Sequence, residues 1–141
     1  MAQVPHAQRV LKDTDRPKRF VFVLLENFSL LCFSTAVESL RIANRMAGKT
    51  LYEWTLIGEG GTSAACSAGT VFQLDSDLTE MNRNDTMLVC SGIDVQAATT
   101  KRVLGWLRRE ARKGLVIGGL CTAAYALAKA GLLDGKRATI H

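Results

Sequence analysis

Residues 115–131 read LVIGGLCTAAYALAKAG, an apolar run that passes through one cysteine into a run of small residues. Residues 115–118 have the continuous apolar composition of a strand buried on both faces. Residues 123–130 favour a helix, which Gly131 ends. Gly119 and Ala123 stand two residues to either side of Cys121, as the crowded strand-to-helix turn called a nucleophile elbow requires. The stretch therefore predicts a strand, an elbow at Cys121 and a helix.

Strand-like and helix-like segments alternate through the rest of the chain. The predicted elements are, in order, a strand at 20–25, a helix at 31–46, a strand at 54–57, short irregular strands within 64–74, a strand at 87–90 and a helix at 98–113. Thr35 and Glu38 fit a capping box for the first helix, and Gly48 fits its stop. This alternation implies a doubly wound, flavodoxin-like α/β domain with a parallel sheet and helices on both faces. Its site is expected at the carboxyl ends of the strands.

The two ends of the chain differ from this pattern. Residues 1–18 are predicted to be a flexible basic tail, and residues 19–141 form the predicted domain. Residues 138–140 have the composition of one more strand, so we expect the domain to continue past His141. The tail lacks the features of a secretory signal, and the longest apolar runs are too short to span a bilayer. We therefore expect a cytoplasmic protein that does not contact membranes.

The charge and the cysteines indicate what the domain does not bind. The net charge of +5 lies largely in the tail and in residues 101–113, where apolar positions form one stripe of the predicted helix. A solvated outer helix explains that segment better than a nucleic-acid interface, which is the alternative. The cysteines, at 32, 66, 90 and 121, show no C-x-x-C spacing, so we expect reduced thiols, no metal and no cofactor. Residues 58–61 (GEGG) are rejected as a dinucleotide motif, because the third glycine position is Ser63.

Cys121 is a candidate nucleophile, because a thiolate is favoured at the start of a helix. The alternative is a structural cysteine at an ordinary strand–helix junction. Small residues after Cys90, namely Ser91 and Gly92, would allow a backbone N–H to face the elbow as an oxyanion donor. His141 follows Cys121 by twenty positions, and a returning strand could bring its imidazole near the thiol.

Three stretches together resemble a known superfamily. They are FVFVLLENFSLLCFSTAVESLRIAN at 20–44, MLVCSGIDV at 87–95 and GGLCTAAYALAKAGLLDGKRATIH at 118–141. The chain resembles the PfpI-like, class I glutamine amidotransferase-like superfamily over residues 19–141. More specifically, it resembles the N-terminal domain of GlxA-type transcriptional regulators of the AraC family. The resemblance implies a ligand-sensing domain whose DNA-binding helix-turn-helix domain is absent from this sequence, so DNA would be bound only through that other part.

The resemblance also identifies where enzymes of the superfamily carry their catalytic partners. Those enzymes pair the elbow cysteine with an acidic residue of the first strand–helix loop or with a histidine directly after the cysteine. The matching positions here hold Cys32 and Thr122. A thiolate without such a partner lacks the activation that hydrolysis requires, although Glu26 and Glu38 remain nearby carboxylates. We therefore expect no catalytic residues.

The predicted function is the binding of a small nitrogenous metabolite, such as a quaternary amine or an amino acid, in a degenerate amidase pocket. The predicted ligand-binding residues are Glu26, Asn27, Phe28, Cys32, Ser91, Gly92, Ile93, Cys121, Thr122, Tyr125 and His141.

Two alternatives stay open. One is a cysteine-dependent hydrolase or hydratase, with Cys121 as nucleophile and the backbone N–H groups of Gly92 and Thr122 as oxyanion donors; residues 121–124 (CTAA) resemble isocyanide hydratases. The other is a structural association module. Proteins of the superfamily commonly self-associate, so a homodimer is expected in every case.

Overall fold

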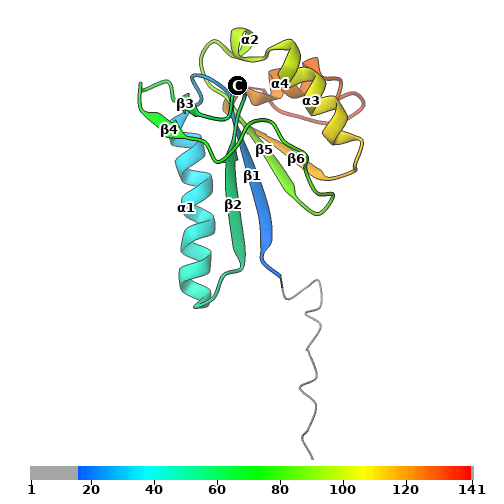
Figure 1. Ribbon diagram of the computed structural model, residues 1–141. Coiled ribbons are helices and arrows are strands. Elements are labelled where there is room, and N and C mark those ends of the chain that lie inside the picture. Colours follow the sequence, from blue (N-terminus) through cyan, green and yellow to red (C-terminus); the bar gives the residue numbers. More distant parts are fainter. Residues whose placement is uncertain (1–15, 141) are drawn as a thin grey trace, which may run out of the picture.

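A four-stranded sheet forms the centre of the computed structural model, which describes residues 16–140 (Figure 1). Its strand order is β2-β1-β5-β6, and all three neighbouring pairs are parallel. The strands are β1 (Lys18–Leu24), β2 (Tyr52–Ile57), β5 (Thr86–Cys90) and β6 (Val116–Leu120). The predicted parallel α/β architecture is confirmed. Lys18 already belongs to β1, and residues 1–15 of the predicted tail lie outside the described part of the chain.

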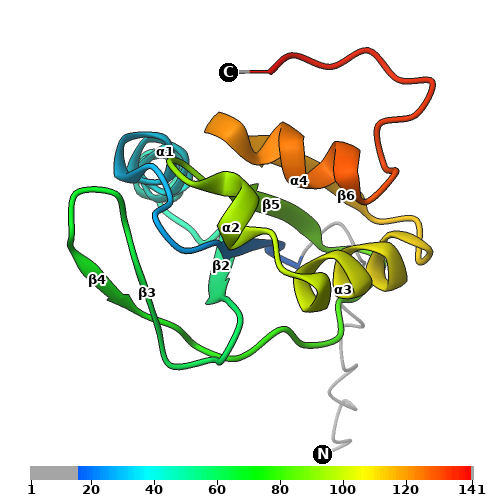
Figure 2. The ribbon, with the colours of Figure 1, turned by 90° about the horizontal axis from the view of Figure 1, so that it is seen from above.

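Helices cover both faces of the sheet. The helices are α1 (Leu30–Ala47), α2 (Val95–Ala98), α3 (Lys101–Ala111) and α4 (Ala124–Lys129), the last preceded by the 3-10 turn η2 (Cys121–Ala123). Seen from above, α1 and α3 lie on opposite sides of the sheet (Figure 2). A short antiparallel hairpin, β3 (Ser63–Ala65) and β4 (Val71–Gln73), stands apart from the sheet, as predicted for residues 64–74.

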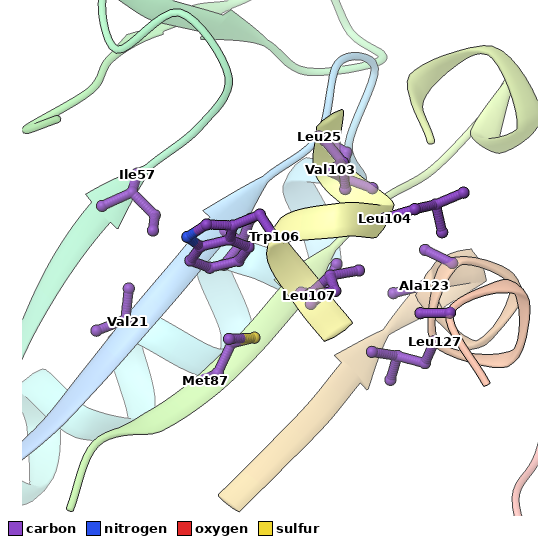
Figure 3. Close-up of a cluster of buried hydrophobic side chains, with 14 of the residues drawn as sticks. Val21, Leu25, Ile57, Met87, Val103, Leu104, Trp106, Leu107, Ala123 and Leu127 are labelled. Atoms are coloured by element: carbon purple, nitrogen blue, oxygen red, sulfur yellow. The ribbon is translucent and has the colours of Figure 1, made fainter. Parts of the chain in front are cut away.

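The side chains of the central strand divide between two hydrophobic clusters. Val21 and Val23 belong to the cluster that α3 and α4 cover, whereas Phe22 and Leu24 belong to the cluster that α1 covers. This division follows from the period of two along a strand. Figure 3 shows the first cluster, in which Leu107 of α3 lies near Met87 of β5. Both faces of β1 are buried, which explains why residues 20–25 are continuously apolar.

The start of α1 differs from the prediction. Ser29 caps this helix, and its hydroxyl accepts a hydrogen bond from the Cys32 N–H at 3.3 Å. Thr35 and Glu38 lie inside the helix, where Thr35 donates to the Leu31 carbonyl and Glu38 pairs with Arg41. The predicted capping box is therefore wrong, because the helix begins more than one turn before Thr35. Its end is as predicted, with Gly48 at φ +64°.

The predicted helix 98–113 is found as α3, which begins at Lys101 and ends at Ala111, and a separate short helix, α2, ends at Ala98. Thr100 breaks the run because its hydroxyl caps α3 and accepts from the Val103 N–H at 3.2 Å. The apolar stripe is buried as expected, and Trp106 is buried with it. Part of the basic face is used within the domain: Arg102 pairs with Asp77, and Arg108 donates to the carbonyls of Ala130 and Lys129. The helix therefore lies on the outside of the sheet, with some of its charge engaged.

The strand predicted at residues 138–140 is wrong. These residues are exposed and form no strand, because within the described chain no neighbouring strand pairs with them. β6 stands at the edge of the sheet and pairs only with β5. Strand propensity without a pairing partner is not enough to form a strand. None of the helices in residues 16–140 is both long and apolar enough to cross a membrane.

A fully buried carboxylate ties α3 to the segment that precedes β5. Glu110 accepts hydrogen bonds from the Met81 N–H at 2.9 Å and from Arg109 Nε at 3.1 Å, and it pairs with Lys113 at 2.5 Å. Burial alone would raise the pKa of Glu110, but the bonds from Lys113, Met81 and Arg109 together outweigh it and hold this pKa below its usual value. The ionised carboxylate is therefore the form that stabilises the fold.

We expect Glu110→Gln to lower the free energy of unfolding by about 2 kcal/mol at neutral pH, since it removes the charge that Lys113 and Arg109 compensate. The amide oxygen can still accept from Met81, so the fold should persist. Because the pKa of Glu110 is lowered by folding, its contribution is present above the reference value of 4.5 and is lost as the pH falls below it. Urea unfolding of both proteins should therefore give a difference that shrinks on acidification. A difference independent of pH would contradict this role.

Candidate functional site

Three loops meet where the central strands end. They follow β1 at residues 25–29, β5 at residues 91–94 and β6 at Cys121. The Ser29 N–H donates to the Ser91 carbonyl at 3.1 Å, and the Thr122 hydroxyl donates to the Gly92 carbonyl at 2.6 Å. Parallel strands place their carboxyl ends at one edge, which explains this convergence. The structure thus brings most of the predicted site residues to one edge of the sheet.

The backbone at Cys121 has the geometry of a nucleophile elbow. Its φ is +57°, in the left-handed region that residues other than glycine rarely adopt. A Cβ on Gly119 would lie 3.1 Å from the Cβ of Ala123 and from Leu127 Cδ1, so only a very small residue fits there without a shift. The small residues around Cys121 are therefore required by the turn. The thiol itself is half-buried.

The hydroxyl groups of Thr122 and Ser91 form a hydrogen-bonded contact beside Cys121. Thr122 Oγ1 lies 2.8 Å from Ser91 Oγ as well as 2.6 Å from the Gly92 carbonyl. The hydroxyl of Thr122 is therefore bonded to the turn after β5. In enzymes of the superfamily that carry a histidine at this position, an imidazole would stand in its place. These hydrogen bonds join the elbow to the end of β5.

Cys32 and Cys90 lie close enough to influence each other. Cys90 is buried at the end of β5, and Cys32 is half-buried in the first turn of α1. Burial first, and then the neighbouring Cys32, raise the pKa of the Cys90 thiol well above its ordinary value. Cys90 is therefore a neutral thiol in the core. Cys32, at the position where the enzymes of the superfamily carry an acidic residue, places a second thiol near it.

The other predicted site residues differ in how far their side chains can reach a ligand. Phe28 is fully buried, and its ring packs edge-on against Phe33 and Phe72, so only its backbone lies at the edge of the sheet. Ile93 is 58% exposed, and Tyr125 is half-buried in α4. Asn27 adopts φ +63°, and its N–H donates to the Ala65 carbonyl at 2.8 Å. His141 lies outside the described residues.

A cavity of about 280 Å³ opens beside this edge, and sequence reasoning identified only one of its charged residues. Glu26, a predicted site residue, lines it together with Glu59, which follows β2. The available signal for Glu59 is its place two residues after a strand, whereas the GEGG pattern suggests only a dinucleotide loop. A larger hollow of about 790 Å³ lies at the opposite edge, beside the start of β1, where α/β sheets do not place their sites. No group of three His, Cys, Asp or Glu side chains suited to a metal occurs within residues 16–140.

Gly92 makes the close approach of the loops possible. A Cβ at this position would stand 2.3 Å from the Asn27 carbonyl oxygen and 2.9 Å from the Ser29 nitrogen. Both contacts are with backbone atoms, which cannot move away as a flexible side chain can. The absence of a side chain at Gly92 is thus what lets the β1 loop lie against the end of β5.

Comparison with known proteins shows that the chain is similar to part of several proteins named as regulators. The family model described as DJ-1/PfpI matches residues 18–141. The HTH-type transcriptional regulator GbdR of Pseudomonas aeruginosa is 35% identical over 136 residues, which cover 96% of this chain and 37% of that protein. The HTH-type transcriptional regulator GlxA of Rhizobium meliloti is 37% identical over 130 residues, which cover 92% of this chain and 40% of that protein. The chain thus spans well under half the length of these relatives.

A solved structure agrees with the sequence matches. The crystal structure of an AraC family transcriptional regulator from Pseudomonas putida is similar with a TM-score of 0.74 and 28% sequence identity. The similarity covers 89% of this chain and 67% of that one. The fold and the type of relative therefore agree with the resemblance drawn from the sequence.

Two glycine substitutions test the packing of the site. Gly92→Ala should lower the free energy of unfolding by about 1–3 kcal/mol, because its Cβ meets backbone atoms of the β1 loop. Gly105→Ala is the matched control, since a Cβ there meets nothing within 4 Å in α3 and should stabilise the helix by about 0.5–1 kcal/mol. Chemical denaturation measures both changes. Equal stabilities for the two variants would contradict the close approach.

Proposed function

The chain belongs to the DJ-1/PfpI family, and from this premise we propose that it is the ligand-sensing module of an AraC-type transcriptional regulator. The observation that carries the proposal is its similarity, over nearly its whole described length, to proteins named as HTH-type transcriptional regulators. In this proposal the effector is a small nitrogenous metabolite. DNA is bound only through another part of the regulator, which acts in the cytoplasm.

The surroundings of Cys121 support sensing over catalysis. A thiol nucleophile needs a base or an acid that activates it. Within residues 16–140, no hydrogen bond joins the Cys121 thiol to a carboxylate or an imidazole, and the hydroxyl of Thr122 is bound by the turn after β5. Cys32 supplies a sulfur where the enzymes carry an acid. The module we propose uses the elbow as a wall of a binding site and not as a nucleophile.

The contacts at the edge of the sheet offer a route from a bound ligand to the rest of the regulator. Thr122 binds the Gly92 carbonyl, and the adjacent Ser91 carbonyl accepts from Ser29, the cap of α1. A ligand that shifts the elbow therefore acts on the start of α1. Along its outer side this helix exposes Leu31 (76%) and Met46 (82%). We propose that this face takes part in a homodimer, which the molar mass in solution would test.

We expect small amines or amino acids to raise the melting temperature of the chain. A ligand that binds only the folded state at ten times its Kd adds about 1.4 kcal/mol, which corresponds to a shift of several degrees. A thermal-shift series at constant ionic strength, with sodium chloride as the control, measures this. If no amine or amino acid shifts the melting temperature, the sensing proposal fails.

The elbow geometry of Cys121 favours one other function, a cysteine hydrolase or hydratase with Gly92 and Thr122 as oxyanion donors. If our proposal is right, iodoacetamide at neutral pH should alkylate Cys121 no more than a few times faster than Cys32, the other half-buried thiol. Mass spectrometry of timed digests gives both rates. A rate at Cys121 far above that at Cys32, together with turnover that Cys121→Ala abolishes, would establish the enzyme instead.

A further inference from the structure

The two edges of the sheet carry opposite charge. The segments that follow β1, β2 and β5, up to the next helix or strand, contain no lysine or arginine, and their acidic residues are Glu26, Glu59 and Asp94. The segments at the starts of the four strands, which we call the amino edge, are residues 16–18, 49–51, 82–85 and 112–114. Because all four strands are parallel, these segments lie at one edge, opposite the elbow. The starts of β1 and β2 and the end of α1 lie together at the lower end of Figure 1.

Each of the four segments of the amino edge supplies at least one exposed cation. Five cationic side chains of this edge are exposed and form no ion pair within the described part of the chain, namely Arg16, Lys18, Lys49, Arg83 and Arg112. The acid of the edge, Asp85, is buried and pairs with Arg19 at 3.3 Å. Five positive charges thus gather here, in a chain whose net charge is +5.

The cations stand on segments that the fold holds in place. The Lys18 N–H donates to the Leu51 carbonyl at 2.9 Å, which joins the starts of β1 and β2. Asp85 accepts from the Asn82 N–H at 2.8 Å and thereby closes the loop that carries Arg83. A surface whose backbone is fixed before binding loses little entropy when a partner docks on it.

A hollow of about 790 Å³ lies at the amino edge. Its lining includes the cations Arg16, Lys18, Arg19 and Arg83 and the acids Glu53 and Asp85. Arg19 and Asp85 compensate each other, so one exposed acid, Glu53, stands against three cations. Sheets of this kind bind their small ligands at the opposite edge. The hollow is therefore explained better as part of a docking surface than as a second effector pocket.

The cations are spread along the edge and do not converge on one point. Neighbouring strands lie about 4.8 Å apart, so four strands span about 14 Å. A small anion would contact only part of such a row, whereas a DNA duplex carries one negative charge for about every 1.7 Å of its axis. The row therefore fits a polymer of repeating negative charge.

We propose that the amino edge is a contact surface for the phosphate backbone of DNA. The inference rests on the proposed function, because a module of an AraC-type regulator works close to DNA. It goes beyond that function by assigning a surface to this proximity. Another part of the regulator binds and selects the operator, and the amino edge then touches phosphates, which carry no sequence information. The elbow and its loops lie at the far edge of the sheet, where the effector can reach them.

The test follows the fluorescence anisotropy of a labelled DNA duplex of about 20 base pairs as the 141-residue chain is added, between 50 and 200 mM sodium chloride. One phosphate contact from each segment gives a slope of log K against log salt concentration of about −3.6, so the Kd should rise about 150-fold over this range. Lys49→Gln, Arg83→Gln and Arg112→Gln combined should raise the Kd at 50 mM about tenfold or more and reduce the slope to about −0.9, since three contacts are removed.

The matched control removes three exposed lysines outside the amino edge. It combines Lys101→Gln, Lys129→Gln and Lys136→Gln. The start of α3 and the whole of α4 lie in the upper half of Figure 1, away from the starts of β1 and β2. The control lowers the net charge by the same amount and should leave the slope unchanged and the Kd within about threefold. Melting temperatures show that both variants are folded.

Equal losses of affinity in the two variants would assign the attraction to net charge and overturn the inference. A slope that the edge variant leaves unchanged would do the same. Poly-glutamate that displaces the labelled duplex as well as unlabelled duplex does would assign the edge to acidic proteins instead of DNA. Duplex binding that depends on the amino edge, in a chain whose melting temperature no amine or amino acid shifts, would support this surface and overturn the proposed sensing function.

Discussion

The carbonyl oxygens of Ser91 and Gly92 hold the carboxyl edge of the sheet together. One accepts from the N–H of Ser29 and the other from the hydroxyl of Thr122, so the turn after β5 joins the start of α1 to the elbow. This arrangement depends on Gly92, since any Cβ there would collide with the β1 loop. The placing of the cap of α1 and of Thr122 beside the strained backbone of Cys121 follows from this contact.

Much of the fold could be predicted because its signals are local. The apolar run at 20–25 indicates a strand buried on both faces. A glycine that follows a helical pattern, as Gly48 does, indicates the end of the helix. The elbow was predictable for the same reason, since Gly119 and Ala123 report crowding within a few residues of Cys121. In each case the residues that determine the local structure lie within a few positions of one another in the sequence.

The errors arise where a local pattern has more than one meaning or where contacts are distant. Thr35 and Glu38 match a capping box, yet the same spacing occurs inside a helix, and Ser29 is the cap. Residues 138–140 have strand composition but no neighbouring strand in the described chain to pair with. The proximity of Glu26 and Glu59 could not be predicted, because it depends on the pairing of β1 with β2 across more than thirty residues.

The position of β1 in the middle of the sheet also has a consequence for biosynthesis. Phe20 of this strand pairs with Trp54 on one side and with Thr86 on the other, so its second partner is made 66 residues later. At about 5–20 residues per second, a ribosome needs roughly 3–13 s to supply it. During that interval the apolar run of β1 has an open edge, which is a template for pairing with another chain. The strand order that builds the site thus leaves one edge of β1 without its partner on the nascent chain until β5 has been made.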